Sequence, residues 1–303
     1  MLLYLLCYIG VVMVVVGILV RAAKIASLPV HLRWELAPVP HEKGKSHYGG
    51  SYFEEFEWWT KKREVSQITA AWYMFQEIFF LKGIWEHQRS LWYFSFPFHQ
   101  GLYLLFGMTA LFFVSAITTL LGGGALVTLF ASLAIIVGWV GYLLGTAGTI
   151  GLLYKRLTDD KLKSYATFAT YFNLVFLAVL FVSGLLAVAF TGSFGVEMTA
   201  FWKGIITFNF QASPGALISF HLLISFLFLI YLPFTYMMHF VAKYFTYHSV
   251  RWDDDPMEVG SKKEKQVQEL LSQPVTWSAK HIGADGKKNW VDLATQEVGK
   301  DDK

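Results

Sequence analysis

Five long apolar runs limit this chain to folds that bury them in lipid. None has an Asp, Glu, Lys or Arg at its centre, and they cover Leu2–Val20, Tyr93–Leu120, Leu126–Tyr154, Tyr165–Thr191 and Ala216–Phe245. Runs of about 20 apolar residues can cross a bilayer as helices. The composition agrees, since 55% of the residues are hydrophobic and only 16% are charged. We expect an all-α integral membrane protein, a bundle of five transmembrane helices.

Basic residues predict which span ends face the cytoplasm. The segments 21–89, 155–163 and 243–303 hold 24 of the 25 Lys and Arg residues, and the other connections share only Lys203. Cytoplasmic loops are rich in Lys and Arg, so we expect the N-terminus outside and the C-terminus in the cytoplasm, across the cell's inner membrane. The first run has no basic residue before it and has the length of a full span, so we interpret it as a retained anchor.

This orientation divides the chain into four parts. They are transmembrane helix 1 at 1–20, a cytoplasmic loop at 21–92, a four-helix membrane core at 93–245 and a cytoplasmic tail at 246–303. The tail has one short helical pattern near Lys262–Leu271. We expect the core to carry the function and the two cytoplasmic parts to meet a partner.

The cytoplasmic loop contains an amphipathic pattern. Its apolar residues recur at spacings of three and four, at Val65, Ile68, Trp72, Phe75 and Phe79. This spacing predicts a helix with one apolar face. The helix would lie on the membrane, dock a partner together with the basic residues Lys61, Lys62 and Arg63, or pack beneath the protein's own loops.

Three of the nine histidines lie inside spans, where an ionisable side chain is costly and usually functional. His221 and His239 are eighteen residues apart in the fifth run. Eighteen residues make five turns of a continuous helix, so both rings would leave one face about 27 Å apart. Helical rise puts His99 and His239 at a common depth of about 9 Å below the cytoplasmic surface. The sequence therefore pairs these two, with His221 near the external surface.

Imidazoles that face each other inside a helical bundle are typical ligands of heme iron. Cys7 is the one cysteine, so the chain has no Cys-x-x-Cys-His attachment site and no thiolate set for an iron–sulfur cluster. Any heme is therefore held non-covalently, and any iron–sulfur centre belongs to a partner. The alternative is that the three histidines form interhelical hydrogen bonds.

Other residues near these histidines bear on the same question. Gly101 would let a porphyrin approach. A row of glycines in the third span allows either tight helix packing or room for a macrocycle, at Gly138, Gly141, Gly145, Gly148 and Gly151. Second hydrogen-bond partners for the fifth-span imidazoles could come from Ser219, Ser225, Thr235 and Tyr236. Six histidines lie in the cytoplasmic segments, and most of them are expected to be ordinary solvated residues: His31, His41, His47, His87, His248 and His281.

The stretch from His221 to His239, with Pro233-Phe234-Thr235 inside it, resembles the last span of the respiratory nitrate reductase gamma subunit family. Phe98-His99-Gln100-Gly101 resembles that family's Phe-His-x-Gly, and Leu152–Asp159 resembles its third-to-fourth connection. The resemblance covers spans two to five. It implies a quinone-reactive cytochrome with two b-type hemes that anchors a cytoplasmic redox module.

The resemblance also implies a ligand set. By position, His99 and His239 would ligate the cytoplasmic-side heme b, and His221 the external-side heme b. The family has a second histidine ten residues after the first, where this chain has Thr109. The preceding Met108 is at a suitable depth and methionine can ligate heme iron, but an ideal helix turns it about 180° from His99. One or two hemes are therefore expected, the second six-coordinate, five-coordinate, loosely held or absent.

The long first loop and tail are similar to those of membrane cytochrome b subunits from the transmembrane electron-transfer complexes of sulfate-reducing organisms. That branch implies a cytoplasmic iron–sulfur partner of the heterodisulfide-reductase type and a periplasmic multiheme cytochrome c. Electrons would pass between that iron–sulfur subunit and quinone, with menaquinone a candidate, or the cytochrome c. No nucleic-acid partner and no catalytic residue are expected.

Two other functions remain open. One is the quinol-oxidising gamma subunit of a respiratory nitrate reductase. The other is a transporter or scaffold without a cofactor, whose histidines relay protons or pack the helices. The spans lack the carboxylates that proton relays use, and no pair of broken helices is evident, so the sequence favours electron transfer.

Overall fold

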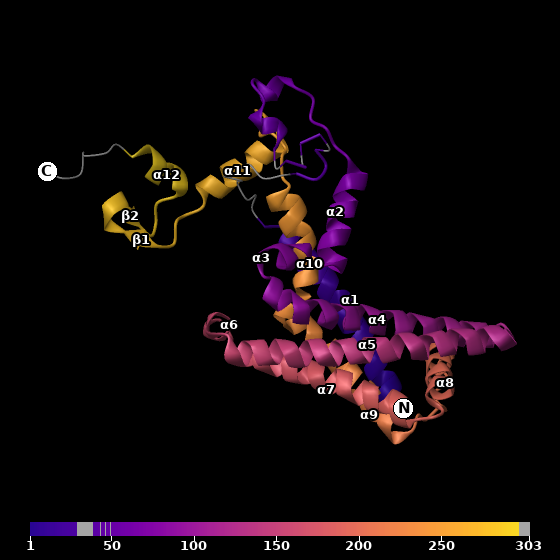
Figure 1. Cartoon of the computed structure of the whole chain (residues 1–303). Helices are drawn as coiled ribbons and strands as arrows, with labels where there is room; N and C mark the ends of the chain where they lie inside the picture. The colour runs from indigo at the N-terminus through magenta and orange to yellow at the C-terminus, as the bar shows by residue number, and fades with distance from the viewer. Residues whose placement is uncertain (29–38, 43, 46, 49, 297–303) are drawn as a thin grey trace. The chain divides into compact units, whose positions relative to one another are not determined.

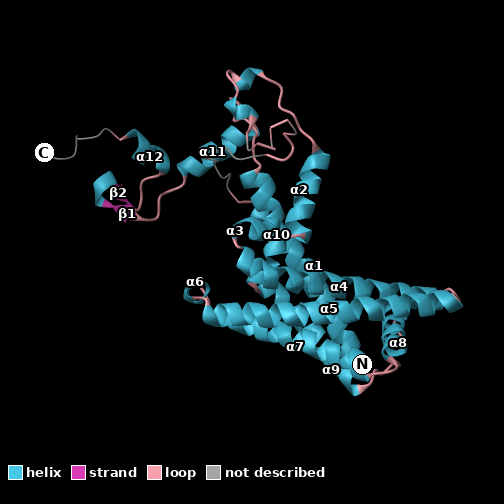
Figure 2. Cartoon of the chain, viewed as in Figure 1, coloured by secondary structure: helices cyan, strands magenta, loops and turns pink. Residues whose placement is uncertain are grey.

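A computed structural model describes residues 1–28, 39–42, 44–45, 47–48 and 50–296 of the chain, and His31 lies outside them. Helices dominate the described part (Figure 2). The α-helices are α1 (Leu2–Ala26), α2 (Gln67–Phe79), α3 (Lys82–His87), α4 (Arg89–Leu120), α5 (Gly124–Thr158), α6 (Asp160–Ser164), α7 (Phe168–Phe190), α8 (Phe194–Thr207), α9 (Ala216–Tyr231), α10 (His239–Thr246), α11 (Lys262–Ser272) and α12 (Trp290–Thr295).

Shorter elements complete the described chain. Five 3₁₀ turns and one π turn are η1 (Tyr52–Glu54), η2 (Trp58–Thr60), η3 (Leu232–Phe234), η4 (Tyr236–Met238), the π turn η5 (Tyr247–Arg251) and η6 (Lys280–Ile282). A small antiparallel hairpin pairs β1 (Ser278–Ala279) with β2 (Ala284–Asp285), with Ser278 opposite Asp285. The helices predicted at 65–79 and 262–271 are confirmed as α2 and α11.

Five helices are long and apolar enough to cross a membrane, which confirms the predicted number of spans. They are Leu2–Ala26, Arg89–Leu120, Gly124–Thr158, Phe168–Phe190 and Ala216–Phe234. Their side chains are largely exposed, as expected for helices that face lipid rather than water. The protein is a helical multi-pass membrane protein.

The chain forms two compact units, Met1–Ile18 with Ala71–Met238, and Leu19–Ala70 with His239–Lys303. The first unit contains the span bundle. Within it α4 packs along α5, α5 packs on α7, and α7 packs on α9 (Figure 1). Its core is aromatic and aliphatic and includes Phe112, Tyr142, Phe181, Phe201 and Ile218.

Glycines set the close approach of α4 and α5. A Cβ atom on Gly101 would lie 2.5 Å from Cα of Gly145, and one on Gly148 would lie 2.3 Å from the backbone nitrogen of Phe98. No larger residue fits at such distances, so the backbones meet directly. Of the two roles predicted for the glycine row, tight packing is the one observed. The prediction that Gly101 opens toward a porphyrin is wrong, because it faces α5.

The fifth span is broken, whereas the sequence predicted one helix over Ala216–Phe245. Helix α9 ends at Tyr231, the turns η3 and η4 follow, and α10 begins at His239. Pro233 has no backbone N–H for the helical ladder, and Thr235 adopts extended backbone angles of −110° and 164°. The prediction that His221 and His239 share one face of a continuous helix is therefore wrong.

Helix α8 was not predicted, because its segment was interpreted as a plain connection between spans four and five. It has 14 residues and packs against α4 and α5. Phe194 and Phe201 are buried, and the Phe201 ring stacks on Tyr4 of α1 at 4.6 Å. The pattern of such a short amphipathic helix is hard to recognise in a sequence when long apolar spans lie on either side of it.

Candidate functional site

His99 is held in a defined tautomer by its own helix. Its Nδ1 lies 2.7 Å from the backbone oxygen of Ser95. A carbonyl oxygen can only accept a hydrogen bond, so Nδ1 carries the proton and donates. In the neutral imidazole the lone pair then belongs to Nε2. This is the arrangement of a histidine that ligates a metal through Nε2 while a second partner fixes the ring.

His221 lies at the centre of a buried polar cluster within the same unit. Its side chain is 4% exposed. Its Nε2 lies 2.7 Å from the hydroxyl of Tyr142 on α5, and its Nδ1 lies 3.1 Å from the hydroxyl of Ser183 on α7. Three helices of the bundle therefore meet at this imidazole, which agrees with the interhelical hydrogen bonds named as the alternative reading of the sequence.

The proton positions in this cluster follow from its outermost contact. Ser183 donates its hydroxyl proton to the backbone oxygen of Leu180 at 2.9 Å. Its oxygen must then accept from Nδ1 of His221, so Nε2 holds the lone pair and Tyr142 donates to it. The same lone pair would be needed to ligate iron. His221 in this conformation does not fit a heme unless the Tyr142 hydroxyl moves away.

Met108 and Thr109 occupy the position where a partner ligand for His221 was predicted. Met108 is 3% exposed, and its sulfur would lie 2.6 Å from a Cβ atom on Gly138. Thr109 donates its hydroxyl to the Leu105 backbone oxygen at 2.9 Å. The Met108 thioether thus packs on α5, and Tyr142, one turn further along α5, is the residue that reaches His221.

His239 is the first residue of α10 and belongs to the second unit. Its side chain is exposed, and it follows directly on the buried Met238. The pairing of His239 with His99 stays a prediction. Across the described chain, no three His, Cys, Asp or Glu side chains gather as a protein-only metal site.

The sequence did not reveal Tyr142 and Ser183 as partners of His221. It did suggest Ser225 as a possible partner of a fifth-span imidazole. Ser225 donates to the backbone oxygen of His221 at 2.8 Å, and its oxygen is 3.5 Å from Nε2. Ser219 and Thr235 instead donate to the backbone oxygens of Pro214 and Leu232. The one available signal for Tyr142 was a tyrosine near the middle of a glycine-rich apolar span.

The second unit contains a buried ionic cluster that corrects the prediction for His41. Nε2 of His41 lies 2.7 Å from Oδ2 of Asp254, so His41 is not an ordinary solvated residue. Arg63 pairs with Asp254 at 3.2 Å and also with Asp255. Glu42 is buried and accepts from Ser51 and from the Tyr52 backbone N–H.

Burial governs the acid–base properties of this cluster. Burial raises the pKa of Glu42, and the donors Ser51 and Tyr52 only partly offset it. Burial also acts to raise the pKa of Asp254, but the hydrogen bond and charge of His41 and the charge of Arg63 hold it below its usual range. Asp254 is therefore the ionised member that joins the first loop to the tail.

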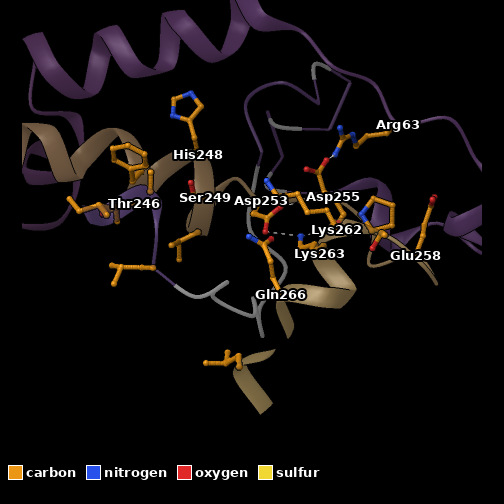
Figure 3. Close-up of a pocket in the computed structure, with 18 of the residues that line it drawn as sticks. Arg63, Thr246, His248, Ser249, Asp253, Asp255, Glu258, Lys262, Lys263 and Gln266 are labelled. Carbon is orange, nitrogen blue, oxygen red and sulfur yellow. Dashed lines mark hydrogen bonds and ion pairs between the residues drawn. The ribbon is translucent and has the colours of Figure 1, made fainter. Parts of the chain in front are cut away.

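A hollow of about 1380 Å³ lies in the second unit (Figure 3). Its lining includes both signs of charge, and Lys263 donates to Asp253 at 2.7 Å across it. Two of the basic residues predicted to dock a partner are already paired within the chain, Arg63 with Asp255 and Lys61 with Glu55 at 2.8 Å. Lys62 is exposed.

Five apolar spans, with His99 and His221 among them, define a helical multi-pass membrane protein. The family model of the nitrate reductase gamma subunit matches residues 84–253, more than half of the chain. The chain belongs to this family, whose members are b-type heme cytochromes. It is thus a membrane subunit of cytochrome b type in a multi-subunit respiratory complex. No curated protein and no solved structure matches it.

Proposed function

We propose that this chain transfers electrons across the inner membrane, between quinone or a periplasmic multiheme cytochrome c and a cytoplasmic iron–sulfur subunit of the heterodisulfide-reductase type. The observation that carries the proposal is the tautomer of His99, whose Nδ1 donates to the Ser95 carbonyl and whose Nε2 lone pair is thereby set for iron. Family membership over 84–253 supports it independently.

His99 and His239 would hold the cytoplasmic-side heme b through their ring nitrogens. The heme would supply one-electron chemistry. The chain would supply the rest: Ser95 fixes the His99 ring, and the apolar spans keep water away and lower the local dielectric. A neutral imidazole on each side suits this role because neither ligand adds charge to the membrane interior.

His221 is the proposed ligand of an external-side heme b, with Met108 as the candidate sixth ligand. The hydrogen bond from Tyr142 to Nε2 makes this second heme conditional on movement of the tyrosine. Menaquinone is the proposed membrane carrier on that side. With the cytoplasmic-side heme alone, partner chains would have to carry electrons through the external half of the membrane. With both hemes, this chain would carry electrons across the whole membrane.

The test of the main proposal is the optical spectrum of the purified protein with single histidine substitutions. The wild type should show a reduced b-type alpha band. His99→Ala and His239→Ala should each abolish or strongly weaken that band, because a bis-imidazole site loses one ligand. His281→Ala, outside the spans, is the matched control. An undiminished alpha band in His239→Ala would contradict the proposed ligand pair.

The quinol-oxidising subunit of a nitrate reductase is the alternative function that the family match favours. The two differ in the partner. Affinity purification of the full chain from its own membranes should bring down an iron–sulfur subunit of heterodisulfide-reductase type. Recovery of a molybdenum-containing nitrate reductase would select the alternative. Properly folded protein without any iron would instead favour a transporter or scaffold.

A further inference from the structure

Helix α2 has the polarity of a helix that does not face water. Its apolar stripe points outward, with Ile68 86% exposed and Trp72 53% exposed. Phe75 and Phe79 continue the same stripe and are exposed as well. A surface helix of a water-soluble domain turns its apolar stripe toward the core and its polar face outward. The reversal indicates an apolar environment outside α2.

The inner side of α2 carries the polar contacts. Glu77 is 9% exposed, and its Oε2 accepts a hydrogen bond from the backbone N–H of Gly83 in α3 at 3.4 Å. Lys82 donates to the side-chain oxygen of Gln76 at 3.3 Å and lies over the Tyr73 ring at 4.7 Å. The turn between α2 and α3 thus satisfies these polar groups internally, and the outward stripe remains apolar.

The end of α2 is fastened to a membrane-crossing helix. Backbone oxygens at its end, and that of Phe80 directly after it, accept hydrogen bonds from side chains of α4. Trp92 donates to the oxygen of Phe80 at 2.8 Å, Gln100 to that of Phe79 at 2.7 Å and Tyr103 to that of Ile78 at 2.9 Å. The final carbonyls of a helix lack partners within it, and they are costly to leave unpaired in lipid.

These three donors place the end of α2 beside the first turns of α4. From Trp92 to Tyr103 the helix rises about 17 Å, so the three donors all lie on the first half of a helix that is apolar enough to cross a membrane. Because a span enters the bilayer at its end, an apolar stripe held beside the first turns of α4 is well placed to meet lipid.

We propose that α2 is an interfacial helix whose stripe of Ile68, Trp72, Phe75 and Phe79 inserts into the headgroup–acyl boundary of the bilayer. Its rings pack on one another: Trp72 stacks on Phe75 at 5.5 Å, and the Phe75 and Phe79 rings lie 4.5 Å apart in a tilted arrangement. Aromatic side chains favour this layer of the membrane. The helix lies outside the matched residues 84–253, so the inference rests on this chain and not on its family.

The test uses the full chain in lipid nanodiscs. Cys7 is the sole cysteine, so a Cys7→Ala background allows one nitroxide label at a time. Labels would be placed at Ile68→Cys, Trp72→Cys and Phe75→Cys. Collision rates with oxygen, which concentrates in lipid, and with a water-soluble nickel chelate would be compared. Matched controls are Phe106→Cys, exposed on the α4 span, and Gln268→Cys, exposed on α11.

Labels on the stripe should collide with oxygen more than with the nickel chelate, as at Phe106. The proposal is overturned if the chelate dominates, as at Gln268, or if both reagents are excluded, which would mean that protein covers the stripe. If labelled variants fail to fold, brominated lipids provide a second measurement. They should quench less fluorescence in Trp72→Phe than in the wild type, and equal quenching would contradict insertion of Trp72.

Discussion

At the scale of single residues, His99 and His221 differ in the hydrogen-bond partners of their ring nitrogens. In His99 a backbone carbonyl fixes Nδ1 and so assigns the lone pair to Nε2. In His221 the same assignment holds, but the Tyr142 hydroxyl already uses that nitrogen. The sequence located both imidazoles correctly inside spans. It could not locate Tyr142, because the contact joins residues 79 positions apart and depends on how α5 meets α9.

Tyr142→Phe should lower stability while keeping the ring. The substitution removes the donor to the buried Nε2 of His221, and an unsatisfied buried acceptor costs about 1–3 kcal/mol. Denaturation in detergent micelles, followed by circular dichroism, would measure the loss. Tyr154→Phe, at an exposed position of α5, is the control. A Tyr142→Phe protein that is no less stable and binds one more heme than the wild type would instead show that His221 is a ligand.

Asp254 should make the second unit sensitive to acid. Its pKa is lower in the folded chain than its ordinary value, so its ionised form stabilises the fold. That contribution is present above the unfolded pKa, about 3.9, and is lost as the pH falls through the folded pKa. Glu42, with its raised pKa, acts in the opposite sense and gains stability as it is protonated.

We therefore expect Asp254→Asn to lower the stability of the second unit by about 1–3 kcal/mol near neutral pH and by less in acid. Thermal unfolding at pH 7 and at about pH 2, well below the ordinary aspartate pKa of about 3.9, would measure the difference. Asp160→Asn, at the start of the exposed helix α6, is the control. An equal loss at both pH values would mean that the charge of Asp254 is not what joins the loop to the tail.

At the scale of elements, the contact between α4 and α5 depends on glycines, which have no side chain to separate the two backbones. The glycine spacing predicted that a face of the third span could approach a neighbour closely. The structure identifies the neighbour as α4 and the opposing residues as Gly101 and Phe98. Long apolar runs specify spans well because the bilayer requires them. Breaks such as the one at Pro233–Thr235 are harder to predict, because proline is tolerated in membrane helices.

Gly101→Ala should separate α4 from α5. Its methyl group would lie 2.5 Å from the Gly145 backbone, which cannot rotate away as a side chain can. Overpacking of this kind costs about 1–3 kcal/mol, more than the helix propensity that alanine adds. Gly107→Ala is the matched control on the same helix, since its nearest neighbour would be an ordinary 3.8 Å away. Equal melting temperatures for the two variants would contradict this account.

At the scale of the whole molecule, the family model covers the middle of the chain and leaves both ends unmatched. Residues 84–253 cover α4 to the π turn, and α1, α2 and the tail beyond 253 lie outside. The sequence predicted the span number and the helices α2 and α11 because each is a local pattern. The polar cluster around His221 and the buried pair of His41 and Asp254 join distant segments, so local patterns could not reveal them.

Removal of residues 262–303 should leave the membrane core intact and weaken partner binding. The tail follows the matched region, and α11 and α12 pack against each other. The truncated chain should reach the membrane with an unchanged heme spectrum, and pull-down of the iron–sulfur partner should fall. Loss of the spectrum with full partner recovery would reverse these assignments.

The interruption between Tyr231 and His239 also affects which insertions and deletions the fifth span can accept during evolution. An inserted or deleted residue in a continuous helix rotates everything beyond it by about 100°. Here two short turns at Leu232–Met238 lie between His221 and His239 and can absorb such a change. The direction of one imidazole can thus change without rotating the other. One histidine can therefore be lost or take another role while the other keeps its function.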